Sequence, residues 1–242
     1  MDFSHVSQRI SQSSPTEFGS VFNRSVELFK KVWLQGFITL LLTFVAVIPL
    51  YVLLYVPMMA MGISDPEAFE HNEVPPAFAA FMAVVVPIFS VGAMTVGVCL
   101  NAAFLRICRK YDMDETGRDD YFYYFKKTYV VKALILSLLM FGLSLLGMLA
   151  CGLGLIYLVV PMSLFPAFFA FDRDLTAMEI VKSGFALGNK NWLIIFALVL
   201  VAGLVAQLGI ILCVVGVFFT AMFSKIPIYF IYKDAIGLSM DT

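Results

Sequence analysis

Long apolar runs are the feature of this sequence that most limits its fold. A helix needs about 20 mostly apolar residues to cross the hydrocarbon core of a bilayer. Only 14% of the 242 residues are charged, against about 25% in an ordinary soluble domain. We therefore expect an all-α integral membrane protein with six transmembrane helices. The six predicted spans are residues 32–61, 77–105, 128–149, 154–171, 191–212 and 214–232.

The distribution of Lys and Arg predicts the orientation of these spans. The chain has 16 such residues. All except Lys225 lie in one of four places: the N-terminal segment, the connection between the second and third spans with the start of the third span, the connection between the fourth and fifth spans, or the C-terminal tail. The connection at residues 63–76 has none. Because cytoplasmic loops are enriched in Lys and Arg, we expect a multi-pass protein of a cytoplasmic membrane with both termini in the cytoplasm.

Three segments on the predicted cytoplasmic side are typical of interfacial amphipathic helices. The first begins with Ser14–Glu17, which fits a capping box, and the second is the aromatic segment Asp119–Tyr129. In the third, Thr176 and Glu179 form the capping-box pattern at the start of a helix. These helices either anchor the bundle at the membrane surface or present their polar faces to a cytoplasmic partner.

An internal repeat relates the middle of the chain to its end. Leu146–Gly154 and Leu208–Gly216 both read L-G-x-x-x-C-x-x-G, and each predicts a tight turn between two spans. Each unit consists of an interfacial helix, a span, a turn and a second span, and it begins and ends in the cytoplasm. The repeats are therefore parallel rather than inverted. We expect one membrane domain, residues 1–242, built of three hairpin repeats at about 14–110, 119–174 and 177–234.

One stretch carries a family resemblance. FDRDLTAMEIVKSGFALGNKNWLIIF, Phe171 to Phe196, combines an aspartate, a short helix, A-x-x-x-x-x-S and G-N-x-x-W ahead of a span. It resembles uncharacterised bacterial six-span membrane proteins that are similar to the membrane domain of glycerophosphodiester phosphodiesterases. The resemblance implies a bacterial cytoplasmic (inner) membrane. The catalytic phosphodiesterase domain is not part of this sequence, so the resemblance implies no such activity.

Several function classes lack their sequence signatures. The interiors of the predicted spans contain no Asp, Glu or His, and the chain has neither HExxH nor G-x-S-x-G, so we do not expect an enzyme. The four cysteines form no C-x-x-C pair, which gives no sign of a disulfide framework or a metal site. We expect no cofactor. The chain has no basic stripe with interleaved aromatic residues away from the apolar spans, so we do not expect it to bind nucleic acid.

Lys225 is the exceptional charge, since it lies within the sixth predicted span. A lysine near the middle of a bilayer costs about 2.5–3.5 kcal/mol on insertion scales. Three interpretations are open: its ammonium reaches toward the membrane surface, it bonds carbonyls that Pro227 leaves free, or it contacts a ligand or a partner. Together with Ser224 and Pro227 it forms the candidate contact site. For Asn101 and the other polar span residues, hydrogen bonds between helices are expected.

Two functions follow as hypotheses. The first is a non-enzymatic accessory or scaffold subunit of a larger inner-membrane assembly, whose partners are the lipid bilayer and other membrane subunits. The alternative is a transporter or lipid-handling protein with a cavity between repeats near Lys225. Because the spans contain no acidic side chain, a carboxylate or phosphate facing Lys225 would come from a lipid, a substrate or a second subunit.

Overall fold

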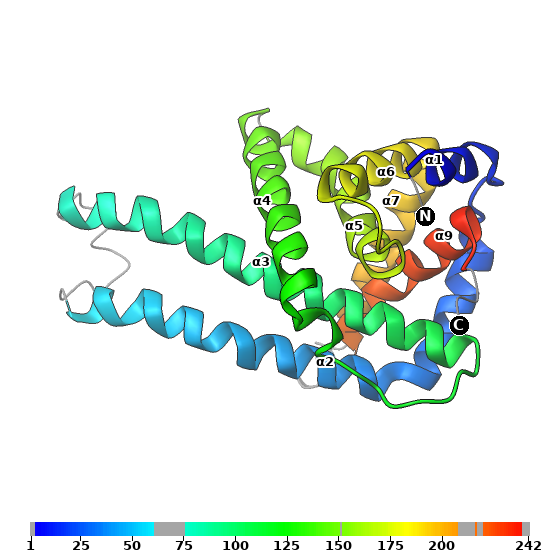
Figure 1. Cartoon of the computed structure of the whole chain (residues 1–242), viewed down its shortest axis with the longest axis horizontal. Helices are drawn as coiled ribbons and strands as arrows, with labels where there is room; N and C mark the ends of the chain where they lie inside the picture. The colour runs from blue at the N-terminus through cyan, green and yellow to red at the C-terminus, as the bar shows by residue number, and fades with distance from the viewer. Residues whose placement is uncertain (1–2, 61–75, 151, 208–215, 217–219, 239–242) are drawn as a thin grey trace.

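The structure is a computed structural model that describes residues 3–60, 76–150, 152–207, 216 and 220–238. Every regular element in these ranges is helical, and no strand occurs among them (Figure 1). This confirms the all-α class. The other residues include 63–75 of the predicted connection and the turn at Cys213, so the predictions for these segments lie outside the described part of the chain.

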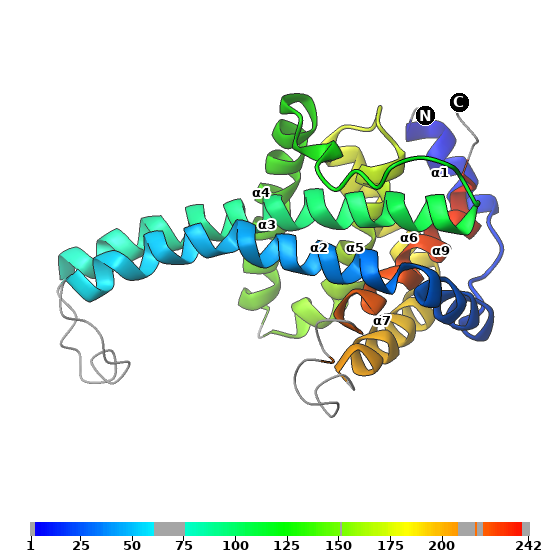
Figure 2. The same ribbon diagram turned by 90° about the horizontal axis from the view of Figure 1, so that it is seen from below.

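The longest elements are α2 (Phe18–Ala60) and α3 (Pro76–Asp112). They pack against each other along their length, and their outer halves project away from the other helices (Figures 1 and 2). Many large apolar side chains of these projecting halves are exposed, including Val45, Ile48 and Ile88. Such surface suits contact with lipid rather than with water.

The second pair of helices is a tight hairpin, as predicted. Helix α4 (Lys127–Leu149) is followed by α5 (Leu153–Phe171), and Gly152 adopts a left-handed conformation between them, with φ of 76°. The two helices approach closely beside the turn. A Cβ atom on Gly154 would lie 2.8 Å from the Cα atom of Gly147, so glycine at both positions allows this close approach. In Figures 1 and 2, α4 crosses α3 steeply.

The third set of helices begins with α6 (Ala177–Lys190), and the predicted capping box is present at its start. The Thr176 side chain accepts a hydrogen bond from the backbone N–H of Glu179, and the Glu179 side chain accepts one from the backbone N–H of Thr176. Helix α7 (Trp192–Gln207) follows after a bend of 97°. The chain then ends with the 3₁₀ turn η4 (Ala221–Lys225) and the helix α9 (Ile226–Ile236).

A helix that the sequence did not predict precedes these sets. Helix α1 (Phe3–Gln12) packs on α6 and α9 through Val6 and Ile10, one turn apart. Lys190 donates hydrogen bonds of 2.6, 3.0 and 2.6 Å to the carbonyls of Ile10, Ser11 and Ser13 at its C-terminal end. A cation there satisfies carbonyls that the helix itself leaves unpaired.

Four described helices are long and apolar enough to cross a membrane, or five if the bent pair α6–α7 forms one span. These are segments of α2, α3, α4 and α5: Phe18–Pro49, Phe78–Asp112, Lys127–Leu149 and Leu153–Phe171. The chain is therefore suited to a multi-pass membrane protein. Six spans in three parallel repeats are not confirmed, because the described part of the sixth predicted span forms only η4 and the short helix α9.

The predicted interfacial segments differ from one another in the structure. The first is continuous with α2, so Ser14–Glu17 lies in the linker before the helix rather than capping a separate one. The second contains only the 3₁₀ turn η2 (Tyr123–Phe125) before α4 begins. The third is the separate helix α6. A helix does not end where its surface changes from amphipathic to wholly apolar, since only backbone signals end it.

Candidate functional site

Lys225 lies at the junction of η4 and α9. Its φ and ψ of −93° and −21° keep the chain helical there, and Pro227 occupies the first turn of α9. Proline fits this place because the first N–H groups of a helix have no partner within the helix. The backbone thus places the lysine directly ahead of a buried helix: every residue from Ile226 to Tyr232 is buried.

The Lys225 side chain borders a hollow of about 210 Å³ between α3, α4, α5 and α9. Met94, Gly97, Val98, Asn101, Leu105, Met140, Met162, Ser163, Pro166, Lys225 and Ile228 line this hollow. The lining residues are mainly apolar. Three of them are methionines, whose flexible side chains adapt to irregular ligands. We call it the Lys225 hollow.

Within the described part of the chain, the Lys225 ammonium makes neither a hydrogen bond nor an ion pair. The half-buried Asn101 amide, which also lines the hollow, likewise makes no hydrogen bond among these residues. The interpretation in which Lys225 bonds backbone carbonyls is therefore not seen in these residues. A cation and an amide that face one hollow without partners can together bind an anionic group.

The other two predicted site residues have structural roles. Ser224 donates to the carbonyl of Ala221 at 2.9 Å. Ser163, which matches Ser224 after a one-residue slip between the two copies of the repeat, donates in the same way to the carbonyl of Val160 at 2.7 Å. Pro227 is buried at the start of α9. The structure thus brings Lys225 together with Asn101 and Ser163, whereas Ser224 and Pro227 do not line the hollow.

A polar layer marks one end of the molecule. Asp112, the last residue of α3, accepts hydrogen bonds from Lys233 and from the Tyr229 hydroxyl. Arg24 of α2 pairs with Asp234. Lys225 precedes Lys233 by eight residues, which at 1.5 Å per residue corresponds to about 12 Å along α9. Lys225 therefore precedes Lys233 of this charged layer by about two helical turns.

A larger hollow, of about 560 Å³, lies at this polar end between α2, α3 and α9. Its charged walls are already paired within the protein: Arg24 with Asp234, Glu27 with Lys30, and Lys31 with Asp114. Paired charges offer a ligand less than free ones, because binding must first break the existing contact. The smaller Lys225 hollow is the better candidate site for this reason.

A third polar feature joins α5 to its neighbours. Asp172, directly after α5, is 1% exposed and accepts a hydrogen bond of 2.5 Å from the Tyr232 hydroxyl. Burial raises the pKa of Asp172 above its ordinary value, and the hydrogen bond from Tyr232 opposes this rise. The stretch Phe171–Phe196 contains this residue, but its pattern gave no indication of this contact. Lys132 donates to the backbone carbonyl of Asp172 at 3.3 Å, so this residue contacts α4 through its backbone and α9 through its carboxylate.

The described residues contain no group of three or more His, Cys, Asp or Glu side chains that could hold a metal ion. Comparisons with protein-family models, with curated proteins and with solved structures found no match to this chain. The resemblance of Phe171–Phe196 to six-span bacterial membrane proteins therefore stays a prediction. Function has to be argued from the geometry of the Lys225 hollow.

Proposed function

We propose that this chain is a multi-pass membrane protein that binds the anionic head of an amphiphile at Lys225, and that it handles or transports that amphiphile. The observation that carries the proposal is the unpartnered ammonium of Lys225 facing a mainly apolar hollow. The cost of a lysine at this depth, about 2.5–3.5 kcal/mol, is offset when a carboxylate or phosphate pairs with it.

The size of the hollow limits the ligand. Pockets for drug-sized molecules measure roughly 300–1,000 Å³, and the Lys225 hollow measures about 210 Å³. It accommodates a head group and the first part of a chain rather than a whole lipid. The exposed apolar faces of α4 and α5, which include Leu138 and Ile156, extend the surface on which an acyl chain can lie.

The finer architecture belongs to the same proposal. Six crossings in three parallel hairpins, both termini in the cytoplasm and a bacterial inner membrane would set the polar layer at the cytoplasmic surface and Lys225 within the bilayer. The contacts between equivalent segments of the repeat support this: Phe168 packs edge-on against Tyr232, with ring centroids 5.2 Å apart. The ring of Phe171, which matches Tyr232 after the one-residue slip between the two copies, lies 5.1 Å from the Tyr232 ring.

Replacement of Lys225 by Met tests the proposal. We expect Lys225→Met to bind oleate and lysophosphatidylglycerol at least about tenfold more weakly than the parent, because a charge-assisted hydrogen bond contributes roughly 1.5–3 kcal/mol. Binding is measured by native mass spectrometry of the purified protein in neutral detergent. Lys225→Arg, which keeps the charge, should retain most of the affinity.

The matched control is Lys182→Met, which removes one exposed lysine from α6. The control should bind both amphiphiles as the parent does. Equal binding by Lys225→Met and Lys182→Met would refute the proposal. That result would favour the other hypothesis, an accessory subunit whose projecting α2–α3 hairpin (Figure 1) contacts other membrane proteins.

A further inference from the structure

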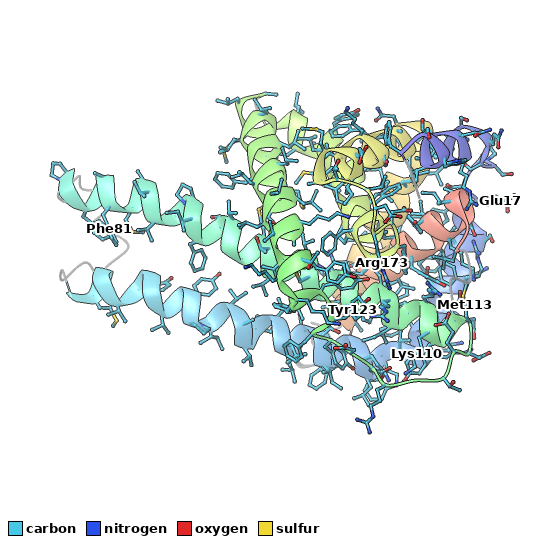
Figure 3. The ribbon with its side chains drawn as sticks, in the orientation of Figure 1. Glu17, Phe81, Lys110, Met113, Tyr123 and Arg173 are labelled. Carbon is cyan, nitrogen blue, oxygen red and sulfur yellow. The ribbon has the colours of Figure 1, made fainter. Side chains whose placement is uncertain are left out.

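Several cations surround the ring of Tyr123, which lies in η2 just before α4. The Arg106 guanidinium carbon is 3.6 Å from the centroid of the Tyr123 ring, the Lys126 ammonium 4.8 Å and the Arg173 guanidinium carbon 5.6 Å. Figure 3 shows Tyr123 and Arg173 next to each other, although fifty residues separate them. We call Arg106, Lys126 and Arg173 the Tyr123 cation cluster.

The members of this cluster lack anionic partners. Among the described residues, none of the three cations forms an ion pair or donates a hydrogen bond. Nearby cations behave differently: Arg109 pairs with Glu115 at 3.2 Å, and Lys110 pairs with Asp119 at 2.6 Å. Three positive charges around one ring repel each other, and cation–π attraction contributes only about 0.5–2 kcal/mol per cation. The arrangement therefore favours an added anion.

One hydrogen-bond donor of the Arg106 side chain is unsatisfied. Its Nη1 atom is buried and has no hydrogen-bond partner in the described structure. Of the three cations, Arg106 also lines a hollow of about 170 Å³, together with Lys110 and Arg118. The two carboxylates of this hollow are already engaged: Glu115 with Arg109, and Asp120 with the backbone N–H of Phe122. Neither of these contacts involves Arg106.

The ionisation of Tyr123 reports the local positive field. Burial acts to raise the pKa of its phenol, but the hydrogen bond with Tyr129 and the charges of Arg173, Arg106 and Lys126 outweigh it, so the pKa of Tyr123 is lowered. The charges of Arg173, Arg106 and Lys126 thus each favour a negative charge at the ring. An anion bound beside the ring would reduce this effect.

The setting of the cluster indicates where such an anion comes from. It lies at the start of α4, a candidate span, beside Phe122, whose side chain is 59% exposed. Lys126 and Arg173 are exposed as well. Exposed aromatic rings and cations at the end of a spanning helix are typical of the membrane–water interface, where anionic lipid head groups lie.

We propose that the Tyr123 cation cluster is a binding site for a phosphate group, held by Arg106, Lys126 and Arg173 at the surface of the membrane. The phosphate belongs to an anionic lipid head group or to a soluble phosphate compound. This site is separate from the Lys225 hollow, because no residue lines both, and it stands whether or not Lys225 binds an amphiphile.

The test uses Lys126→Gln/Arg173→Gln, which removes two exposed cations and leaves the half-buried Arg106 in place. Lys30→Gln/Lys31→Gln is the matched control, since it removes the same charge from two cations that carboxylates already pair. In one arm, the full-length proteins are placed in phosphatidylcholine nanodiscs with a minor fraction of phosphatidylglycerol, and retained phosphatidylglycerol is counted by native mass spectrometry. In the other arm, thermal unfolding is measured with increasing inorganic pyrophosphate.

We expect the parent and the control to retain phosphatidylglycerol with at least about tenfold higher affinity than Lys126→Gln/Arg173→Gln. Stabilisation by pyrophosphate that only this variant loses, without a difference in the lipid arm, would support the site and assign it to soluble phosphate. The proposal is overturned if the variant and the control behave alike in both arms. Lys225→Met should behave as the parent in both arms, which keeps this test separate from that of the Lys225 hollow.

Discussion

Side chains from η2 and α4 complete the C-terminal end of α5. The Tyr124 hydroxyl donates to the carbonyl of Ala170 at 2.7 Å, and Lys132 donates to the carbonyl of Arg173 at 3.1 Å. These carbonyls lie in or just after the last turn of α5, where no further turn supplies an N–H donor. Tyr124 is 1% exposed, so water cannot replace its hydroxyl.

Removal of this hydroxyl tests the role of Tyr124. We expect Tyr124→Phe to reduce the free energy of unfolding by about 1–3 kcal/mol, because it leaves a buried carbonyl without a donor. Chemical denaturation in detergent measures the change. Tyr121→Phe should have little effect, since the Tyr121 hydroxyl makes no hydrogen bond within the described residues. Equal losses for the two variants would contradict the assignment.

At the scale of single residues, the sequence identified individual unusual residues but not the groups of residues that meet only in the folded structure. Lys225 was recognisable because it is charged within an apolar span. Its neighbour Asn101 was assigned to ordinary hydrogen bonding, because nothing in the sequence brings α3 to the junction of η4 and α9. The Tyr123 cation cluster was not predicted for the same reason: Arg106 and Arg173 come from segments that only tertiary packing unites.

At the scale of helices, the contact between α5 and α6 is set by a glycine. A Cβ atom on Gly184 would lie 2.4 Å from Cε1 of Phe165 and 3.0 Å from the carbonyl oxygen of Pro161. Real Cβ atoms do not approach other atoms so closely. Phe165 is fully buried and cannot move aside without disturbing the core.

We therefore expect Gly184→Ala to reduce the free energy of unfolding by about 1–3 kcal/mol through overpacking. Gly203→Ala in α7 is the matched control, because no atom outside the neighbouring residues and backbone of its own helix lies within 4 Å of its added Cβ. That substitution should be neutral or should stabilise the helix by up to about 1 kcal/mol. Thermal unfolding of both variants measures the difference, and an unchanged midpoint for Gly184→Ala would contradict the packing argument.

Local signals allowed some elements to be predicted and not others. The capping box at Thr176 and the turn at Gly152 act through the backbone within a few residues, so the sequence located both. Helix α1 was missed because its apolar face consists of few residues, Val6 and Ile10 among them, and gains its stability from α6 and α9. Isolated helices of this length are marginal in water.

At the scale of the whole molecule, the predicted topology places α1 and the connection after α3 on one side of the membrane and residues 63–76 on the other. Arg9 of α1 donates to the carbonyl of Ile236 at the end of α9. The two ends of the described chain therefore meet at one end of the structure. The crossing of α3 by α4 could not be predicted, because apolar composition specifies that a helix crosses a membrane but not its angle to its neighbours.

Cysteine labelling tests this topology. In a background without native cysteines, Glu67→Cys should react with an impermeant maleimide added to intact cells. Gln8→Cys and Arg118→Cys, at exposed positions of α1 and the connection after α3, should react only after the cells are permeabilised. Reaction of Gln8→Cys in intact cells would reverse or abolish the predicted orientation.

The contacts of α9 have a consequence for biogenesis. Arg24 pairs with Asp234 across 210 residues of sequence, and Arg9 meets Ile236 across 227. During synthesis, α1 and α2 leave the ribosome long before α9 exists to pack against them. The contacts that α1 and α2 make with α9 can therefore form only after nearly the whole chain has been synthesised.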